Sequence, residues 1–159
     1  NSRRLEKSFR LQNADLLTEY NLVEAGLARP VVKAGDFHGK TAYLAQRDRE
    51  HQPAYLCTMT MTDNKDAAGI ARYPVGPCPI VDPATREVLV DEVGRRSYAT
   101  SIAYGPSVGK NIALGYLPKA YATEGQKLLL EYFDEPFPIK VETVGCKGLY
   151  DPESLLQRS

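Results

Sequence analysis

The chain has 159 residues, of which 43% are hydrophobic, enough to bury the core of one domain or of one domain with an appendage. Twenty basic and twenty acidic residues leave no net charge, which argues against nucleic acid or an anionic membrane surface as the main partner. No apolar run approaches the roughly eighteen residues that a membrane-spanning helix needs. The chain begins with Asn1 and carries no signal-peptide pattern, so we expect an intracellular fragment of a longer protein.

The cysteines and histidines offer little for metal binding or nucleophilic catalysis. Cys57, Cys78 and Cys146 are too few and too widely spaced for a disulfide framework, and they indicate reducing, intracellular conditions. His38 and His51 are the only histidines. A zinc site or a Cys-His pair would have to be assembled over long sequence distances, so we predict no metal site and no catalytic residue in this chain. His38 is expected on a surface loop.

In chain order, the first clear element is a helix over Lys40–Arg49, where residues at helical spacing occur among good helix formers. The pattern then changes to that of strands. Tyr55–Thr62 alternates Cys57, Met59 and Met61 with threonines. This alternation predicts a half-buried strand with the three sulfur-containing side chains inside.

Further short segments are predicted as strands, with turns rich in proline, glycine and aspartate between them. The segments are Pro79–Val81, Glu87–Val93, Tyr98–Ile102, Ile112–Tyr116, Lys127–Tyr132 and Ile139–Val144, with one of the turns at Glu135-Pro136. Many short strands at this spacing predict a mainly β fold, an antiparallel barrel or sandwich over about residues 53–145.

The segment Gly105–Lys110 is not a phosphate-binding loop. Only three residues separate its two glycines, and Asn111 follows the lysine, whereas a Walker A loop needs four intervening residues and a serine or threonine after the lysine. Pro106 also lacks the amide that such a loop would use. A turn leading into the next strand is the better interpretation. No G-x-G-x-x-G fingerprint for a dinucleotide occurs either.

Three short motifs follow one another in the N-terminal part of the chain. Arg4–Lys7 has the sequence R-L-E-K, Glu24–Leu27 has E-A-G-L, and Asp36–Lys40 has D-F-H-G-K. This order resembles the folate-binding module of the glycine cleavage T-protein family, in the version fused to dimethylglycine and sarcosine dehydrogenases. The E-A-G-L motif is expected at a tight turn, where Gly26 gives backbone freedom and Glu24 pairs with a cation.

A second stretch is similar to the C-terminal barrel domain of the same family. Ser97–Ser101 is followed by Gly105–Lys110 and then by Ala113–Pro118, in the order of the family passage that runs from T-S through S-P to a G-Y-V-P strand. Two ordered and separated matches are stronger evidence than either alone, since short motifs also match by chance.

The chain departs from the family pattern at three places. Ser8 stands where glycine is usual, Gln12-Asn13 where an aromatic residue and glycine are usual, and Leu22 where proline is common. The chain therefore looks like a divergent member, and the departures leave open a module that has kept the barrel and lost catalysis.

The resemblance implies an α+β chain that is mainly β. Residues 1–52 would be the helix-containing end of a folate-binding domain, and residues 53–159 a complete Greek-key or jelly-roll-like barrel of the T-protein C-terminal type. Residues 1–30 should be less ordered, or packed against missing domains or another chain, because their family partners lie in an earlier half-domain. The family's catalytic aspartate also lies in that half, so the isolated chain is expected to be inactive.

The resemblance also implies binding residues. A carboxylate is the natural bidentate acceptor for the adjacent N–H donors of a pterin ring, and Glu6 matches the family glutamate in that role. From the residues alone, the alternative is a surface carboxylate beside Arg3, Arg4 or Lys7, or a charge at a helix end. Tyr121 matches an aromatic hydroxyl that reaches toward the folate, against the alternative of a packed ring beside a turn. Lys33 is the nearest basic residue for the folate tail.

The function that the resemblance implies is transfer of a one-carbon, aminomethyl unit to tetrahydrofolate within a longer enzyme. That enzyme would use a folate and an amine donor, with FAD in a separate N-terminal dehydrogenase domain. It would work in the cytoplasm of a bacterium or the mitochondrial matrix of a eukaryote. A non-catalytic binding or assembly module is one alternative, and a folate-dependent methyltransferase or demethylase is the other.

Overall fold

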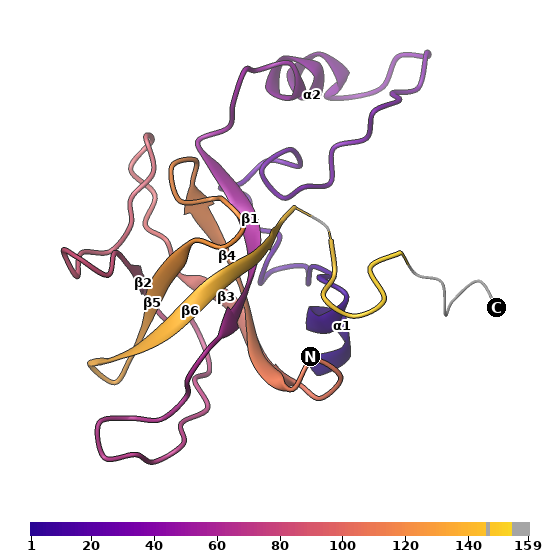
Figure 1. Cartoon of the computed structure of the whole chain (residues 1–159). Coiled ribbons are helices and arrows are strands. Elements are labelled where there is room, and N and C mark those ends of the chain that lie inside the picture. Colours follow the sequence, from indigo (N-terminus) through magenta and orange to yellow (C-terminus); the bar gives the residue numbers. More distant parts are fainter. Residues whose placement is uncertain (146, 154–159) are drawn as a thin grey trace.

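The structure is a computed structural model that describes residues 1–145 and 147–153 (Figure 1). The helices are α1 (Ser2–Glu6) and α2 (Lys40–Arg47). The strands are β1 (Ala54–Met61), β2 (Ile80–Val81), β3 (Ala99–Gly105), β4 (Lys110–Pro118), β5 (Lys127–Tyr132) and β6 (Glu135–Val144). Neither helix has the length or the apolar character to span a membrane, as judged on these residues.

The six strands form one antiparallel sheet in the order β2-β5-β6-β1-β4-β3. The sheet curls so that its two edges approach each other. Pro79, just before β2, forms a bridge with Tyr98, just before β3, and the amide of Ala99 donates to the carbonyl of Cys78 at 2.8 Å. The mainly β prediction and the antiparallel barrel are therefore confirmed, in the form of a curled half-barrel.

The concave side of the sheet holds the main core, which we call the barrel core. Cys57 and Met59 are fully buried and Met61 is 7% exposed, so the prediction that these side chains point inside is confirmed. Burial raises the pKa of the Cys57 thiol to about 12 and makes it a poor nucleophile. The other members of the barrel core include Ile80, Leu89, Leu117, Leu128, Leu130, Phe137, Ile139 and Val141.

A second core lies on the opposite face of the sheet, and we call it the outer core. Leu56, Ile112, Leu114 and Tyr116 project from β1 and β4 on that side. Leu5 of α1 and Ala25 cover them. Both faces of β1 are thus buried, and the prediction of a half-buried strand is wrong because the N-terminal segment covers the face that would have met water.

The N-terminal residues pack on this chain's own barrel, as the position of α1 beside β3 and β4 shows in Figure 1. Leu5, Asp15 and Ala25 are each at most 1% exposed. The expectation that these residues need another chain or domain is wrong for this buried set. Other apolar side chains between residues 9 and 37 stay exposed, among them Phe9 at 53% and Val31 at 82%.

The segment Glu87–Val93 is not a strand, contrary to the sequence prediction. It makes isolated bridges, Val81 with Val88 and Val90 with Arg96. The Asp91 carboxylate accepts hydrogen bonds from the amides of Val93 and Arg95, at 3.0 and 2.9 Å, and so bends the chain back on itself. The local aspartate turn prevails over the apolar alternation.

Element boundaries also differ from prediction. α2 ends at Arg47 rather than Arg49. Glu135-Pro136 belongs to β6 rather than to a turn, and the turn consists of Phe133 and Asp134, both with positive φ, 52° and 62°. Two consecutive left-handed residues make the tight hairpin that matches the twist of β5 and β6.

The departures at Ser8 and Asn13 keep the backbone conformation that glycine would allow. Ser8 has φ 57° and Asn13 has φ 64°, both in the left-handed region. Ser8 also gains a 2.6 Å hydrogen bond between its hydroxyl and that of Thr58. The two substitutions are therefore compatible with the loop geometry that the family motif implies.

We expect Gly115→Ala to destabilise the barrel by about 1–3 kcal/mol, because overpacking has this typical cost. A Cβ at Gly115 would lie 2.7 Å from the carbonyl oxygen of Tyr98 and 3.0 Å from Ile80 Cδ1. Urea unfolding measures the change. Gly35→Ala is the control, since nothing lies within 4 Å of its Cβ position. Equal stability of the two variants would contradict the expectation.

Candidate functional site

Glu6 ends α1 at a point where three segments meet. The backbone carbonyl of Glu6 accepts hydrogen bonds from the amides of Leu149 and Tyr150, at 2.8 and 3.0 Å. A Cβ on Gly148 would come within 2.9 Å of the Lys7 backbone, so the C-terminal segment packs closely against this turn. The buried Leu5 fixes the helix on the outer core. The position of Glu6 is therefore fixed by the C-terminal segment on one side and by the outer core on the other.

The Glu6 carboxylate is buried but has no cation as a partner among the described residues. The residue is 4% exposed, and its Oε1 accepts a 2.6 Å hydrogen bond from the amide of Ser107. Arg4 pairs instead with Asp15, and Lys7 pairs with Asp151. The alternative of a surface carboxylate beside these cations is therefore wrong, whereas the alternative of a charge at a helix end holds for its position, because Glu6 is the last residue of α1. A buried and unpaired carboxylate is costly, which makes it a candidate for function.

A hollow of about 360 Å³ lies beside this carboxylate. Its other lining residues include Arg3, Phe9, Ser107 and Tyr150. Arg3 is exposed and has no ion-pair partner within the described part of the chain, while Phe9 and Tyr150 expose 53% and 40% of their surface. The hollow therefore offers aromatic faces, one buried carboxylate and the cationic side chains of Arg3, Arg4 and Lys7.

Asp15 joins the two groups of sequence motifs. The side chain is fully buried, and its Oδ2 binds Arg4 at 2.7 Å. Its Oδ1 accepts from the hydroxyls of Thr100 and Ser101, at 2.5 and 2.7 Å, and its carbonyl accepts from Tyr116 at 2.8 Å. The R-L-E-K and T-S motifs, far apart in sequence, therefore share one carboxylate.

Glu24 of the E-A-G-L motif is a structural residue. Its carboxylate pairs with Arg95, which also binds Asp91 at 2.7 Å and lies 4.4 Å from the centre of the Tyr20 ring. Burial lowers the pKa of Arg95, but its hydrogen bonds to Glu24 and Asp91 raise it by more. The predicted pairing with a cation and the left-handed Gly26, with φ 69°, are both confirmed.

Tyr121 lies in the turn after β4, partly packed against the barrel core. Its hydroxyl donates to Asp82 Oδ2 at 3.1 Å, and this hydrogen bond raises the pKa of Tyr121. Asp82 Oδ1 accepts from the amides of Thr85 and Ala84, which lower the pKa of the carboxyl. The hydroxyl is thus already held by a well-anchored carboxylate.

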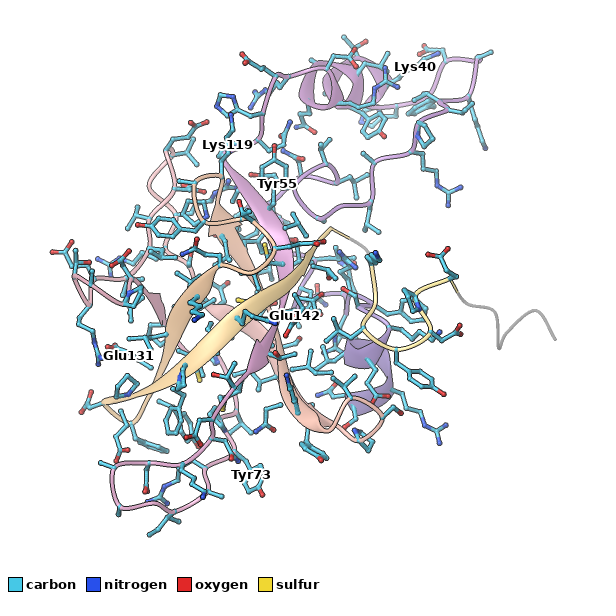
Figure 2. The ribbon with its side chains drawn as sticks, in the orientation of Figure 1. Lys40, Tyr55, Tyr73, Lys119, Glu131 and Glu142 are labelled. Carbon is cyan, nitrogen blue, oxygen red and sulfur yellow. The ribbon has the colours of Figure 1, made fainter. Side chains whose placement is uncertain are left out.

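Lys33 is exposed in the loop before α2 and lines a different hollow, of about 540 Å³. Arg29 and His38 share this hollow with the apolar Val31 and Phe37. His38 is exposed, as predicted. Figure 2 shows Lys40, at the start of α2, on an arm of the molecule away from the strands.

The structure does not bring the three predicted residues together. Glu6 contacts the loop that precedes β4, and Tyr121 follows the other end of the same strand. A strand of that length spans about 30 Å at roughly 3.4 Å per residue. Lys33 belongs to the arm near α2, which Figure 1 places well away from α1. No cluster of three metal-ligating side chains exists within residues 1–145 and 147–153.

Sequence reasoning did not find Asp15, Arg95 or the amide of Ser107. Ser107 lies within the Gly105–Lys110 motif and Asp15 lies between two motifs, but the spacing of the motifs does not say which residues meet across the fold. Arg95 belongs to none of the motifs, and its only local feature is the neighbouring Arg96. Cys146 lies outside the described residues.

The fold defines the class of domain as a curled antiparallel half-barrel. The N-terminal segment covers one face of this half-barrel, and the buried carboxylates of Glu6, Asp15 and Glu24 hold the segment to it. Residues 76–145 match the model of the glycine cleavage T-protein C-terminal barrel domain. This part of the chain is therefore similar to that domain family, in agreement with the second group of motifs.

A solved structure supports the fold over a longer stretch. The chain is similar to the crystal structure of the glycine cleavage system aminomethyltransferase T from Bartonella henselae, with a TM-score of 0.69 and 21% sequence identity. The similarity covers 89% of this chain and 36% of that chain. The domain boundary between residues 52 and 53 stays a prediction. β1, which begins at Ala54, lies within the barrel sheet between β6 and β4.

We expect Asp15→Ala to destabilise the chain by about 3–5 kcal/mol, because it leaves a largely buried arginine without its partner. Arg4 loses its ion-pair partner, and the hydroxyls of Thr100 and Ser101 lose the carboxylate that they both bind. Urea unfolding of the variant measures the effect. Asp36→Ala, at an exposed position, is the control. A loss similar to that of the control would contradict the expectation.

Proposed function

We propose that this chain is part of an enzyme that transfers a one-carbon unit to tetrahydrofolate, with Glu6 as an acceptor for the pterin ring. The single observation that carries the proposal is the state of the Glu6 carboxylate. It is buried, faces a hollow and has no cation partner among the described residues. The match of residues 76–145 to the T-protein C-terminal barrel domain supports a folate as the ligand.

The carboxylate retains capacity for a ligand. An ionised carboxylate has about four lone-pair sites, and the amide of Ser107 uses one of them on Oε1. Oε2 receives no hydrogen bond from the described residues. Adjacent ring N–H and amino donors of a pterin match such an acceptor, and the bond is charge-assisted. The Phe9 and Tyr150 rings beside it suit a flat heterocycle.

Tyr121 and Lys33 have a lesser place in the proposal. Because β4 separates Tyr121 from Glu6, one pterin ring cannot touch both, and Tyr121 would meet another part of an extended folate. Lys33 would meet the anionic tail. The loop before α2 that carries Lys33 would first have to be fixed by contact with another part of the longer protein.

In the proposed reaction, the carbon of an iminium-type amine adduct bonds to two nitrogens of tetrahydrofolate and forms methylene-tetrahydrofolate. The carbon–nitrogen bond of the adduct breaks, and the free amine leaves with the two protons that the folate nitrogens lose. The step depends on holding the folate amine close to the carbon and on proton management by a carboxylate. Glu6 would orient the folate, and the proton-managing carboxylate would come from elsewhere in a longer protein. A fused flavin-dependent dimethylglycine or sarcosine dehydrogenase is the finer form of this proposal and rests on motif resemblance alone.

The departures at Ser8 and Asn13 do not favour the non-catalytic alternative. Both residues keep the left-handed backbone that the motif requires, so the loop after Glu6 keeps its shape. The barrel and the Glu6 site are therefore compatible with a working enzyme.

We predict that a longer protein containing this chain binds tetrahydrofolate and loses about 10- to 100-fold in affinity on Glu6→Ala, the typical cost of a charged hydrogen bond. The 159-residue chain alone should bind weakly and turn over no amine donor, because it supplies at most one wall of the site. Calorimetric titration measures both affinities.

The control is Glu124→Ala, at an exposed position away from Glu6. Tight binding by the isolated chain, or an affinity that Glu6→Ala leaves unchanged, would disprove the assignment of Glu6. The barrel fold would be unaffected by either result.

A further inference from the structure

The loop that joins β3 to β4 makes a specific contact with the Glu6 side chain. The amide of Ser107 donates to Oε1 at 2.6 Å, across 101 positions of sequence. The loop can come this close because residue 105 has no side chain. A Cβ on Gly105 would lie 3.1 Å from Glu6 Cγ and 3.2 Å from Oε1. It would also lie 2.5 Å from Ile112 Cδ1, so the Ile112 side chain would have to shift.

The loop holds this amide in a defined direction. The carbonyl of Gly105 accepts from the amides of Val108 and Gly109, at 3.2 and 2.8 Å. Gly109 takes a left-handed φ of 72°, and Gly105 pairs with Lys110 in the ladder between β3 and β4. Pro106 fixes its own φ. The direction of the Ser107 N–H is therefore a property of the hairpin and does not depend on a flexible side chain.

We propose that the loop over residues 105–109 is a positioning device for Glu6, and that the Ser107 amide turns the carboxylate so that its second oxygen meets the ligand. This inference rests on the proposed function of Glu6. Ser107 acts through Glu6 and does not touch the reacting atoms. A buried carboxylate without a cation needs at least one fixed donor, and the amide supplies it without neutralising the charge.

The hydroxyl of Ser107 provides a clean control. It makes no hydrogen bond to the described residues, so Ser107→Ala removes the hydroxyl and keeps the amide. Ser107→Pro removes the amide donor itself. The comparison of these two variants separates the backbone contact from any role of the side chain.

The test is a double-mutant cycle in a longer protein that contains this chain, with tetrahydrofolate affinity measured by calorimetry. Ser107→Pro should weaken the affinity by about tenfold relative to Ser107→Ala, the cost of losing one charge-assisted hydrogen bond, because only the proline variant lacks the amide donor. In a Glu6→Ala background, Ser107→Pro should have no further effect. An effect that adds to that of Glu6→Ala would overturn the inference, because a loop with a merely structural role would act independently of Glu6.

The outcomes separate the two proposals. If Glu6→Ala leaves the affinity unchanged, the proposed role of Glu6 fails. If Glu6→Ala weakens binding and Ser107→Pro does not, only the positioning role fails. Should Ser107→Pro not fold, replacement of Ser107 by its α-hydroxy analogue removes the same N–H without constraining φ. This analogue should also weaken tetrahydrofolate binding by about tenfold and should have no further effect in the Glu6→Ala background. An unchanged affinity would overturn the inference.

Discussion

The Asp15 carboxylate is the contact on which the rest of the arrangement depends. It has no exposed surface, and it binds one arginine of the N-terminal segment and two hydroxyls of β3. Adjacent residues on a regular strand point to opposite faces, so Thr100 and Ser101 should not both reach it. A register shift between Ala99 and Ser101 inserts an extra residue, and such a bulge re-aims a side chain. The bulge therefore lets one carboxylate hold the N-terminal arm, the segment that contains Leu5 and Ala25, against the sheet.

This fixation explains why the sheet has two cores. With the arm in place, Leu5 and Ala25 cover Leu56, Ile112 and Leu114, and the convex face of β1 and β4 is dry. The stack of Tyr20 on Tyr116, at 3.6 Å between ring centres, continues the same contact. Without the arm, a row of large apolar side chains would face water. The arm and the barrel are thus one packing unit, even though their motifs suggest two domains.

The sequence allowed the barrel, most strands and the inward face of β1 to be predicted, because alternation and turn chemistry are local. It did not allow Glu87–Val93 to be excluded as a strand, because the two amides that Asp91 captures decide that segment and apolar alternation does not. Glu6 could be found by its motif. That it is buried, faces a hollow and is held by the Ser107 amide depends on a hairpin 101 positions away, which no local pattern reveals.

The distance between Glu6 and Tyr121 gives the two ends of β4 different roles. At one end, a tight glycine-containing hairpin holds a buried carboxylate by a backbone amide and leaves one of its oxygens available. At the other end, the Tyr121 hydroxyl is already bound to Asp82, which two backbone amides hold in turn. A ligand could take the first carboxylate without breaking any bond of the described residues. It could take the proton of the Tyr121 hydroxyl only in competition with the charged Asp82, whereas the hydroxyl oxygen could still accept a hydrogen bond from a ligand. Physical accessibility therefore favours Glu6 as the primary contact, and Tyr121 contributes chiefly by closing the turn after β4 onto the turn after β2.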